Sequence, residues 1–259
     1  MSQIGKYVRL GNIYGGKKRV VIVPMDHGPE MGPIRGLENP IQVIENLSKL
    51  KPNAFMFHRG ILLRSYKFLN FFNIPFLLKL NTTNEEGQDP DRNTLVDSVE
   101  DAVKFGASGV VIEFLMGSKY EHEMLRDLGL TARECERWGL PLLVMAYPTG
   151  FENNYDVKLV KHAARIASEL GADIVKLPYT GLKESFREVV EICPVPVIMA
   201  GGTKTENFSD LLRVVENVLE AGAAGTMIGR NIWQADNPGK ALEAIEELVW
   251  NYESKEVKS

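Results

Sequence analysis

Short apolar segments alternate with longer amphipathic segments along most of the chain. The short segments are rich in Val, Ile and Leu, and most lack the polar alternation of a half-exposed strand. This pattern is typical of strands that are buried on both faces. It predicts eight strands, over residues 19–26, 54–58, 75–81, 109–115, 141–147, 173–179, 196–201 and 225–230.

The longer segments have apolar residues at helical spacing. They predict helices over 93–105, 157–170, 208–219 and 240–252, and one long helix or two short ones over 120–138. Several predicted helices are followed by glycine, which is typical of a helix carboxyl terminus. These glycines are Gly106, Gly139, Gly171 and Gly222.

Eight strand-then-helix units in 259 residues predict a (β/α)8 barrel, an α/β fold. The alternative is a doubly wound open sheet. That sheet often has a glycine-rich turn after its first strand, whereas the first strand here ends in MDHGP (25–29). We expect one domain over residues 1–259, with its core at about 19–252 and a frayed, charged tail over 253–259.

Composition excludes several classes of protein. A content of 44% hydrophobic and 25% charged residues excludes disordered and fibrous chains. A net charge of −4 argues against a protein that coats nucleic acid. No segment approaches the roughly 18 apolar residues of a membrane span, and no signal-peptide core follows the polar N-terminus. Cys135 and Cys193 are too few for a disulfide framework and read as packing residues, so we expect a cytoplasmic protein.

Lysines within two predicted strands are candidate nucleophiles, because barrel enzymes carry their chemistry at the carboxyl ends of the strands. Lys176 lies in the apolar segment IVKL (174–177). Desolvation there would favour a free amine, which attacks carbonyl carbon and forms a Schiff base. Lys79, in LKL (78–80), is a competing candidate on the same logic. The alternative for such a lysine is a structural ion pair.

Asp26 and Tyr147 are candidates for proton transfer, since each ends a predicted strand. Their alternatives are a capping aspartate and a core aromatic residue. Histidines occur at two strand ends, His27 and His58, but no HxH or HExxH spacing is present. We therefore expect no metal site.

Glycines at the ends of the last two predicted strands indicate a phosphate site. Gly201 and Gly202 end one strand, and Gly229 precedes Arg230 at the end of the next. Glycine lets backbone N–H groups approach an anion, barrel enzymes often bind phosphate at these loops, and arginine adds a charge-assisted contact. The alternative is that these glycines only make tight turns. Sugar phosphates, flavin mononucleotide and pyridoxal phosphate all use such sites, so the ligand stays open.

Six segments together are similar to one known family. They are VPMDHG (23–28), GPIRGL (32–37), MAYPTG (145–150), ADIVKLPYTG (172–181), AGGTKT (200–205) and AGAAGTMIGRNIWQ (221–234). They resemble the archaeal-type class I fructose-bisphosphate aldolases. That family includes 2-amino-3,7-dideoxy-D-threo-hept-6-ulosonate synthase, an early enzyme of an alternative route to aromatic amino acids. The similarity runs from about residue 5 to residue 247.

The resemblance implies a barrel enzyme that forms a Schiff base with a phosphorylated ketose and needs no cofactor. It implies that Lys176 forms the imine, that Tyr147 transfers protons and that Asp26 is the third catalytic residue. It implies a ring-based homo-oligomer, often a decamer. From the net charge and the lack of a long apolar segment we expect no nucleic-acid or membrane partner. The implied substrate- and phosphate-binding residues are His27, Gly201, Gly202, Gly229 and Arg230.

The resemblance favours fructose-bisphosphate aldolase-type cleavage and condensation. The alternative is the synthase, which transfers a donor unit onto aspartate semialdehyde. The synthase is resembled more by segments 23–28 with 32–37, 126–139 and 200–202, whereas the aldolases are resembled more by Glu30 and segments 57–61 and 77–81. Thr149 stands where both subfamilies usually have arginine. A flavin-dependent barrel and a non-catalytic sugar-phosphate sensor are the remaining alternatives.

Overall fold

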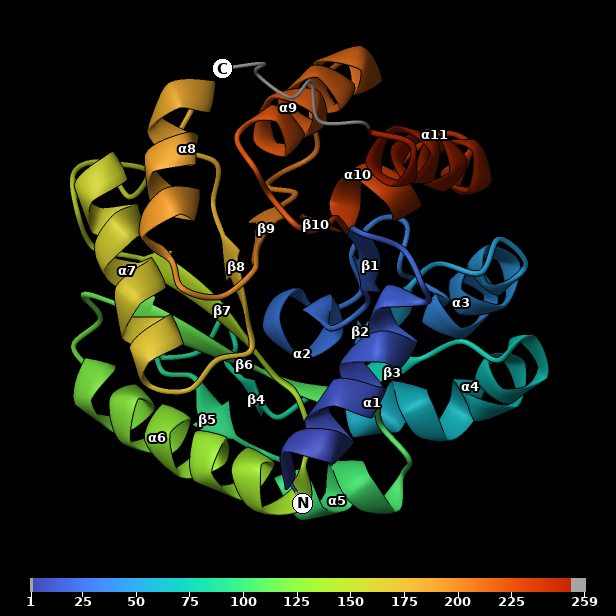
Figure 1. Ribbon diagram of the computed structural model, residues 1–259. Coiled ribbons are helices and arrows are strands. Elements are labelled where there is room, and N and C mark those ends of the chain that lie inside the picture. The colour runs from blue at the N-terminus through green and yellow to red at the C-terminus, as the bar shows by residue number, and fades with distance from the viewer. Residues whose placement is uncertain (1, 253–259) are drawn as a thin grey trace.

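Eight parallel strands close into a barrel in a computed structural model that describes residues 2–252 (Figure 1). Residue 1 and the predicted tail at 253–259 lie outside the described residues. The order around the barrel is β1-β10-β9-β8-β7-β6-β3-β2. The strands are β1 (Val20–Pro24), β2 (Ala54–Phe57), β3 (Phe76–Lys79), β6 (Gly109–Met116), β7 (Leu142–Pro148), β8 (Ile174–Leu177), β9 (Val197–Ala200) and β10 (Gly225–Met227). The predicted α/β barrel and its eight strands are confirmed.

Helices surround the strands or, in the case of α1, lie across the barrel (Figure 1). They are α1 (Ser2–Tyr14), α2 (His27–Met31), α3 (Pro40–Ser48), α4 (Arg59–Phe72), α5 (Val99–Lys104), α6 (Glu121–Trp138), α7 (Val157–Glu169), α8 (Lys183–Ile192), α9 (Phe208–Glu220), α10 (Arg230–Trp233) and α11 (Pro238–Trp250). Residues 120–138 form one helix apart from the first residue. The glycines predicted to end helices, at 106, 139, 171 and 222, all have positive φ.

The helix predicted over 93–105 is wrong in its first half. Thr94–Leu95 form β5, which pairs antiparallel with β4 (Asn81–Thr82). The helix α5 begins at Val99 because Ser98 caps it and accepts a hydrogen bond from the Asp101 N–H. Apolar spacing alone did not show where the cap would stop the helix.

Two apolar layers hold the barrel together. The larger layer lies between the strands and the helices, and the smaller one fills the interior. The interior layer includes Ile13 of α1, and Lys6 of the same helix pairs with Asp173, just before β8, at 3.0 Å. Helix α1, absent from the predicted elements, therefore closes the amino-terminal end of the barrel and leaves the carboxyl end open.

Cys135 and Cys193 are both buried and form no disulfide, as expected for packing residues. Among residues 2–252, no helix is long and apolar enough to cross a membrane.

Candidate active site

The alternation of strand side chains carries polar residues into the barrel mouth. Interior residues on β3, β6 and β8 are apolar at the amino-terminal side, at Leu77, Val111 and Ile174. Two residues further along each strand, the same face carries Lys79, Glu113 and Lys176. Because side chains alternate with a period of two, each of these residues faces the barrel axis at the carboxyl end.

A cavity of about 520 Å³ occupies this mouth. Its lining includes all of the site residues predicted from the sequence: Asp26, His27, Tyr147, Lys176, Gly201, Gly202, Gly229 and Arg230. They come from the ends of five strands and from the loops that follow. The fold thus brings the predicted residues together in one place, whereas Thr149 is not part of the lining.

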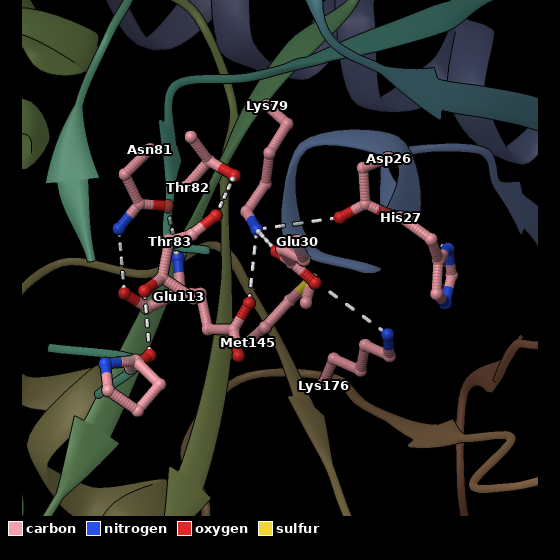
Figure 2. Close-up of polar contacts among 11 residues, drawn as sticks. Asp26, His27, Glu30, Lys79, Asn81, Thr82, Thr83, Glu113, Met145 and Lys176 are labelled. Atoms are coloured by element: carbon pink, nitrogen blue, oxygen red, sulfur yellow. Dashed lines mark hydrogen bonds and ion pairs between the residues drawn. The ribbon is translucent and has the colours of Figure 1, made fainter. Parts of the chain in front are cut away.

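Lys79 sits in an ion cluster rather than free in the cavity (Figure 2). Its side chain is 0% exposed, and Nζ lies 3.0 Å from Glu113 and 3.4 Å from both Asp26 and Glu30. Burial alone would lower the pKa of Lys79, but the three carboxylates raise it above its usual value. Lys79 is therefore held as an ammonium and cannot supply a free amine.

Lys176 has the opposite surroundings. Its Nζ lies 3.8 Å from the Met145 sulfur, to which it donates a weak hydrogen bond (Figure 2). Within residues 2–252, it makes no ion pair. Burial lowers the pKa of Lys176, and the charge of Lys79 lowers it further, against the opposing effect of the carboxylates. The two lysines lie in similar local sequence but favour different protonation states. Lys79 favours the ammonium, and Lys176 favours the neutral amine.

Asp26 and Tyr147 flank Lys176. Burial alone would raise the pKa of Asp26, but Lys79, His27 and Lys176 hold it at about 2, so Asp26 is a carboxylate. Burial raises the pKa of Tyr147 well above its usual value, and nearby carboxylates raise it further, so its phenol keeps its proton. The Lys176 Nζ lies 5.9 Å from the centre of the Tyr147 ring.

The loops after β9 and β10 form the wall of the cavity that lies across the barrel from β3 and β6. Gly202 has a φ of +64°, and a Cβ at Gly229 would lie 3.0 Å from both Pro24 and Trp233. Both positions therefore favour glycine. Asn231 is buried and joins the two loops, because its amide donates to the carbonyls of Gly201 and Thr203 at 3.0 and 2.9 Å.

His27 lies between this wall and Asp26. Its Nδ1 is 3.4 Å from the Asp26 carboxylate, and its ring meets Trp233 edge-on at 5.2 Å between centroids. Burial lowers the pKa of His27, which keeps the ring neutral. His58 directly precedes α4, and burial together with Lys79 lowers its pKa to about 4. Residues 2–252 contain no group of three His, Cys, Asp or Glu side chains placed to hold a metal ion.

A family model described as "DeoC/LacD family aldolase" matches residues 20–235 of the chain. The chain belongs to the DeoC/LacD family of aldolases. This aldolase is 38% identical to a class 1 fructose-bisphosphate aldolase of Thermoproteus tenax, with 92% of each chain covered. It is 37% identical to 2-amino-3,7-dideoxy-D-threo-hept-6-ulosonate synthase 1 of Archaeoglobus fulgidus, with 95% of this chain and 91% of the relative covered.

One solved structure similar to this aldolase is described as a Schiff base forming fructose-1,6-bisphosphate aldolase. It superposes with a TM-score of 0.87 at 36% identity, covering 95% of this chain and all of the other. The chain is thus a class I aldolase, of the type that uses a lysine Schiff base.

Three further residues of this aldolase contribute to the site but were not among the site residues predicted from the sequence. Glu30 and Glu113 hold the Lys79 ammonium, and Asn231 braces the two glycine loops. Glu113 follows the same period-two pattern as Lys79, and Asn231 directly follows Arg230, so both had a local signal. Glu30 lies on the short helix α2, beyond any strand, so its only signal in the sequence was its resemblance to the aldolases.

Proposed function

We propose that Lys176 is the residue that forms the Schiff base with a phosphorylated ketose. The observation that carries the proposal is the contrast between the two buried lysines. Lys79 has three carboxylate partners, whereas Lys176 meets a thioether and faces the cavity. A nucleophilic lysine must be unprotonated when it attacks, and only the surroundings of Lys176 favour that form.

The residues around Lys176 supply the remaining steps. The amine adds to the C2 carbonyl, and the resulting carbinolamine loses hydroxide as water when the Tyr147 phenol donates its proton. The tyrosinate then takes the proton of the C4 hydroxyl as the C3–C4 bond breaks, and the bonding electrons move into the iminium to give an enamine. The Asp26 carboxylate orients a substrate hydroxyl by accepting its hydrogen bond.

The wall opposite Glu113 binds the phosphate of the ketose. Gly201, Gly202 and Gly229 expose backbone near the cavity, and the Arg230 guanidinium lines it without an ion-pair partner in the described part of the chain. Arginine and backbone N–H groups suit phosphate. Phosphate binding here would position C2 for attack by Lys176, so that binding energy remote from the reacting bond contributes to catalysis.

The reaction type that we propose is fructose-bisphosphate aldolase-type cleavage and condensation. The synthase reaction is the second candidate, because the synthase relative is almost as similar to this chain as the aldolase relative is.

We further propose that the protein forms a ring-based homo-oligomer and works in the cytoplasm. The family resemblance supports the oligomer, and the two cysteines, which form no disulfide, support the location.

Borohydride trapping tests the nucleophile. The protein is incubated with dihydroxyacetone phosphate or fructose 1,6-bisphosphate, reduced, and analysed by peptide mass. We expect a substrate-sized adduct on Lys176 and none in the variant Lys176→Met. Lys161→Met, which removes a surface lysine from α7, is the matched control and should still be labelled. An adduct that persists in Lys176→Met would overturn the assignment.

A further inference from the structure

Three carboxyl groups share one ammonium at the wall of the active-site cavity (Figure 2). The Lys79 Nζ lies within 3.4 Å of Glu113, Asp26 and Glu30, whose side chains are only 14%, 4% and 17% exposed. One positive charge does not balance three negative charges that lie so close together with so little water around them. One carboxyl group of the cluster therefore keeps its proton near neutral pH.

Glu30 is the carboxyl group that holds this proton. Asp26 is ionised, because the positive charges around it keep its pKa at about 2. Glu113 makes the shortest contact with Lys79, at 3.0 Å. Burial, together with Glu113 and Asp26, raises the pKa of Glu30 to about 8, against the opposing effect of Lys79. At pH 7 the cluster thus contains one ammonium, two carboxylates and one carboxylic acid.

The acid faces the reacting groups. Glu30, Lys176 and Tyr147 line the same cavity. The negative charge that Glu30 carries when ionised raises the pKa of both other residues, so the three side chains lie within electrostatic reach of one another. On its other side, the backbone of α2 is fixed, because the Glu85 N–H donates to the Glu30 carbonyl at 3.0 Å.

The substrate would pass this acid on its way across the cavity. The proposed phosphate site follows β9 and β10, which lie across the barrel from β3 and β6. With the phosphate at Arg230 and C2 at Lys176, carbon 3 points away from the phosphate wall. The cluster around Lys79, which holds Glu30, lies on that side.

One proton transfer in the proposed mechanism has no donor yet. Cleavage of the C3–C4 bond leaves an enamine, and its carbon 3 must gain a proton before the product can leave Lys176. Tyr147 holds the proton of the C4 hydroxyl at that stage, but burial raises its pKa well above the usual value. A carboxylic acid is the stronger acid, and proton transfer by a positioned acid speeds a reaction by about 10²–10⁴-fold.

We propose that the Glu30 carboxyl group protonates carbon 3 of the enamine. The enamine electrons form the new C–H bond, which leaves an iminium on Lys176 and a carboxylate on Glu30. Water then adds to C2 of the iminium, and the proton that it releases returns to Glu30. The Lys79 ammonium stabilises the Glu30 carboxylate between the two transfers. The assignment rests on the proposed function and adds a step to it.

The variant Glu30→Gln tests the assignment. Its amide is neutral, like the carboxylic acid, and its oxygen can accept a hydrogen bond from Lys79, but it has no proton to transfer. We expect exchange of the carbon 3 hydrogen of dihydroxyacetone phosphate with D2O, followed by NMR, to fall by about 10²-fold. Borohydride trapping of the imine on Lys176 should be unchanged. Glu86→Gln, at an exposed residue outside the cavity lining, is the matched control and should change neither result.

A second measurement detects the enamine itself. Hexacyanoferrate(III) oxidises an enamine that has not been protonated. During cleavage of fructose 1,6-bisphosphate, Glu30→Gln should therefore consume more of this oxidant per aldehyde released than wild type does. Glu30→Asp keeps an acid on a shorter side chain and should exchange faster than Glu30→Gln. A purely structural role would instead lower trapping, exchange and oxidation together.

The outcomes separate the two proposals. Unchanged exchange in Glu30→Gln overturns the role of Glu30 and leaves the Schiff base on Lys176 standing. Loss of trapping in step with exchange also overturns this role, because Glu30 would then act on the fold or on imine formation. Absence of any adduct on Lys176 in the wild type overturns the proposed function and the role of Glu30 with it.

Discussion

The variant Lys79→Met should destabilise the protein strongly, and more so at high pH. The substitution removes an ammonium that is itself 0% exposed and lies 3.0 Å from Glu113 and 3.4 Å from Asp26 and Glu30. Methionine has a similar length, so the main effect is electrostatic. Removing one partner of a buried ion cluster costs about 3–5 kcal/mol, because the carboxylates left behind are mostly buried and have lost the ammonium that paired with all three. For a chain of this size, that corresponds to a fall in Tm of about 10 °C.

The pH dependence follows from Asp26. In the native protein its pKa is about 2, below the usual value of 3.8, because the cations around it outweigh burial. A lowered pKa stabilises the folded state above the usual pKa, and that stability is lost as pH falls toward 2. Without Lys79, burial dominates and raises the pKa of Asp26, so the same group opposes folding as pH rises. The stability gap between wild type and Lys79→Met should therefore widen from pH 5 to pH 8.

Urea unfolding at pH 5, 6.5 and 8 measures this gap. Lys161→Met, which breaks the surface pair with Glu188, is the matched control and should cost less than about 1 kcal/mol at every pH. A gap for Lys79→Met that stays constant or narrows with rising pH would refute the reasoning. A cost no larger than that of Lys161→Met would show that the cluster does not hold the ammonium as the distances imply.

Three further predictions concern other parts of the molecule. Tyr147→Phe should lower kcat by about 10²-fold or more while leaving inhibition by inorganic phosphate unchanged, because only proton transfer is lost. Asn231→Ala should raise KM for the ketose phosphate about tenfold with little change in kcat, because the brace between the glycine loops is lost. Glu246→Gln should stabilise the protein at pH 8 by about 2 kcal/mol. Burial raises the pKa of Glu246 from 4.5 to about 8, so wild-type stability falls as pH rises through that window.

Each of these results has a contradicting outcome. Steady-state kinetics would contradict the role of Tyr147 if kcat fell less than tenfold. An Asn231→Ala variant with altered kcat but unchanged KM would mean that the loops bind no phosphate. Urea unfolding would contradict the Glu246 prediction if the variant gained as much stability at pH 5 as at pH 8.

The sequence predicted the barrel because every strand is short, apolar and followed by an amphipathic segment. Such local patterns arise because each strand is buried on both faces, and the strands of every parallel barrel share this burial. Residues 93–98 were mispredicted because β4 and β5 form a small antiparallel sheet outside the barrel, in which Thr94 pairs with Thr82, a residue outside the segment whose spacing was read. Helix α1 was missed because its apolar side covers a barrel end that exists only after the strands have closed.

The sequence by itself determined which residues reach the barrel mouth. The period of two along each strand places Lys79, Glu113 and Lys176 on the interior face without reference to their neighbours. Only the tertiary structure decided what these residues do. Charge state depends on groups within a few ångströms, and the carboxylates that hold Lys79 come from β6, from α2 and from the segment between β1 and α2. Two lysines in near-identical local sequence therefore become an ammonium and a candidate free amine, because folding places three carboxylates against one and a thioether against the other.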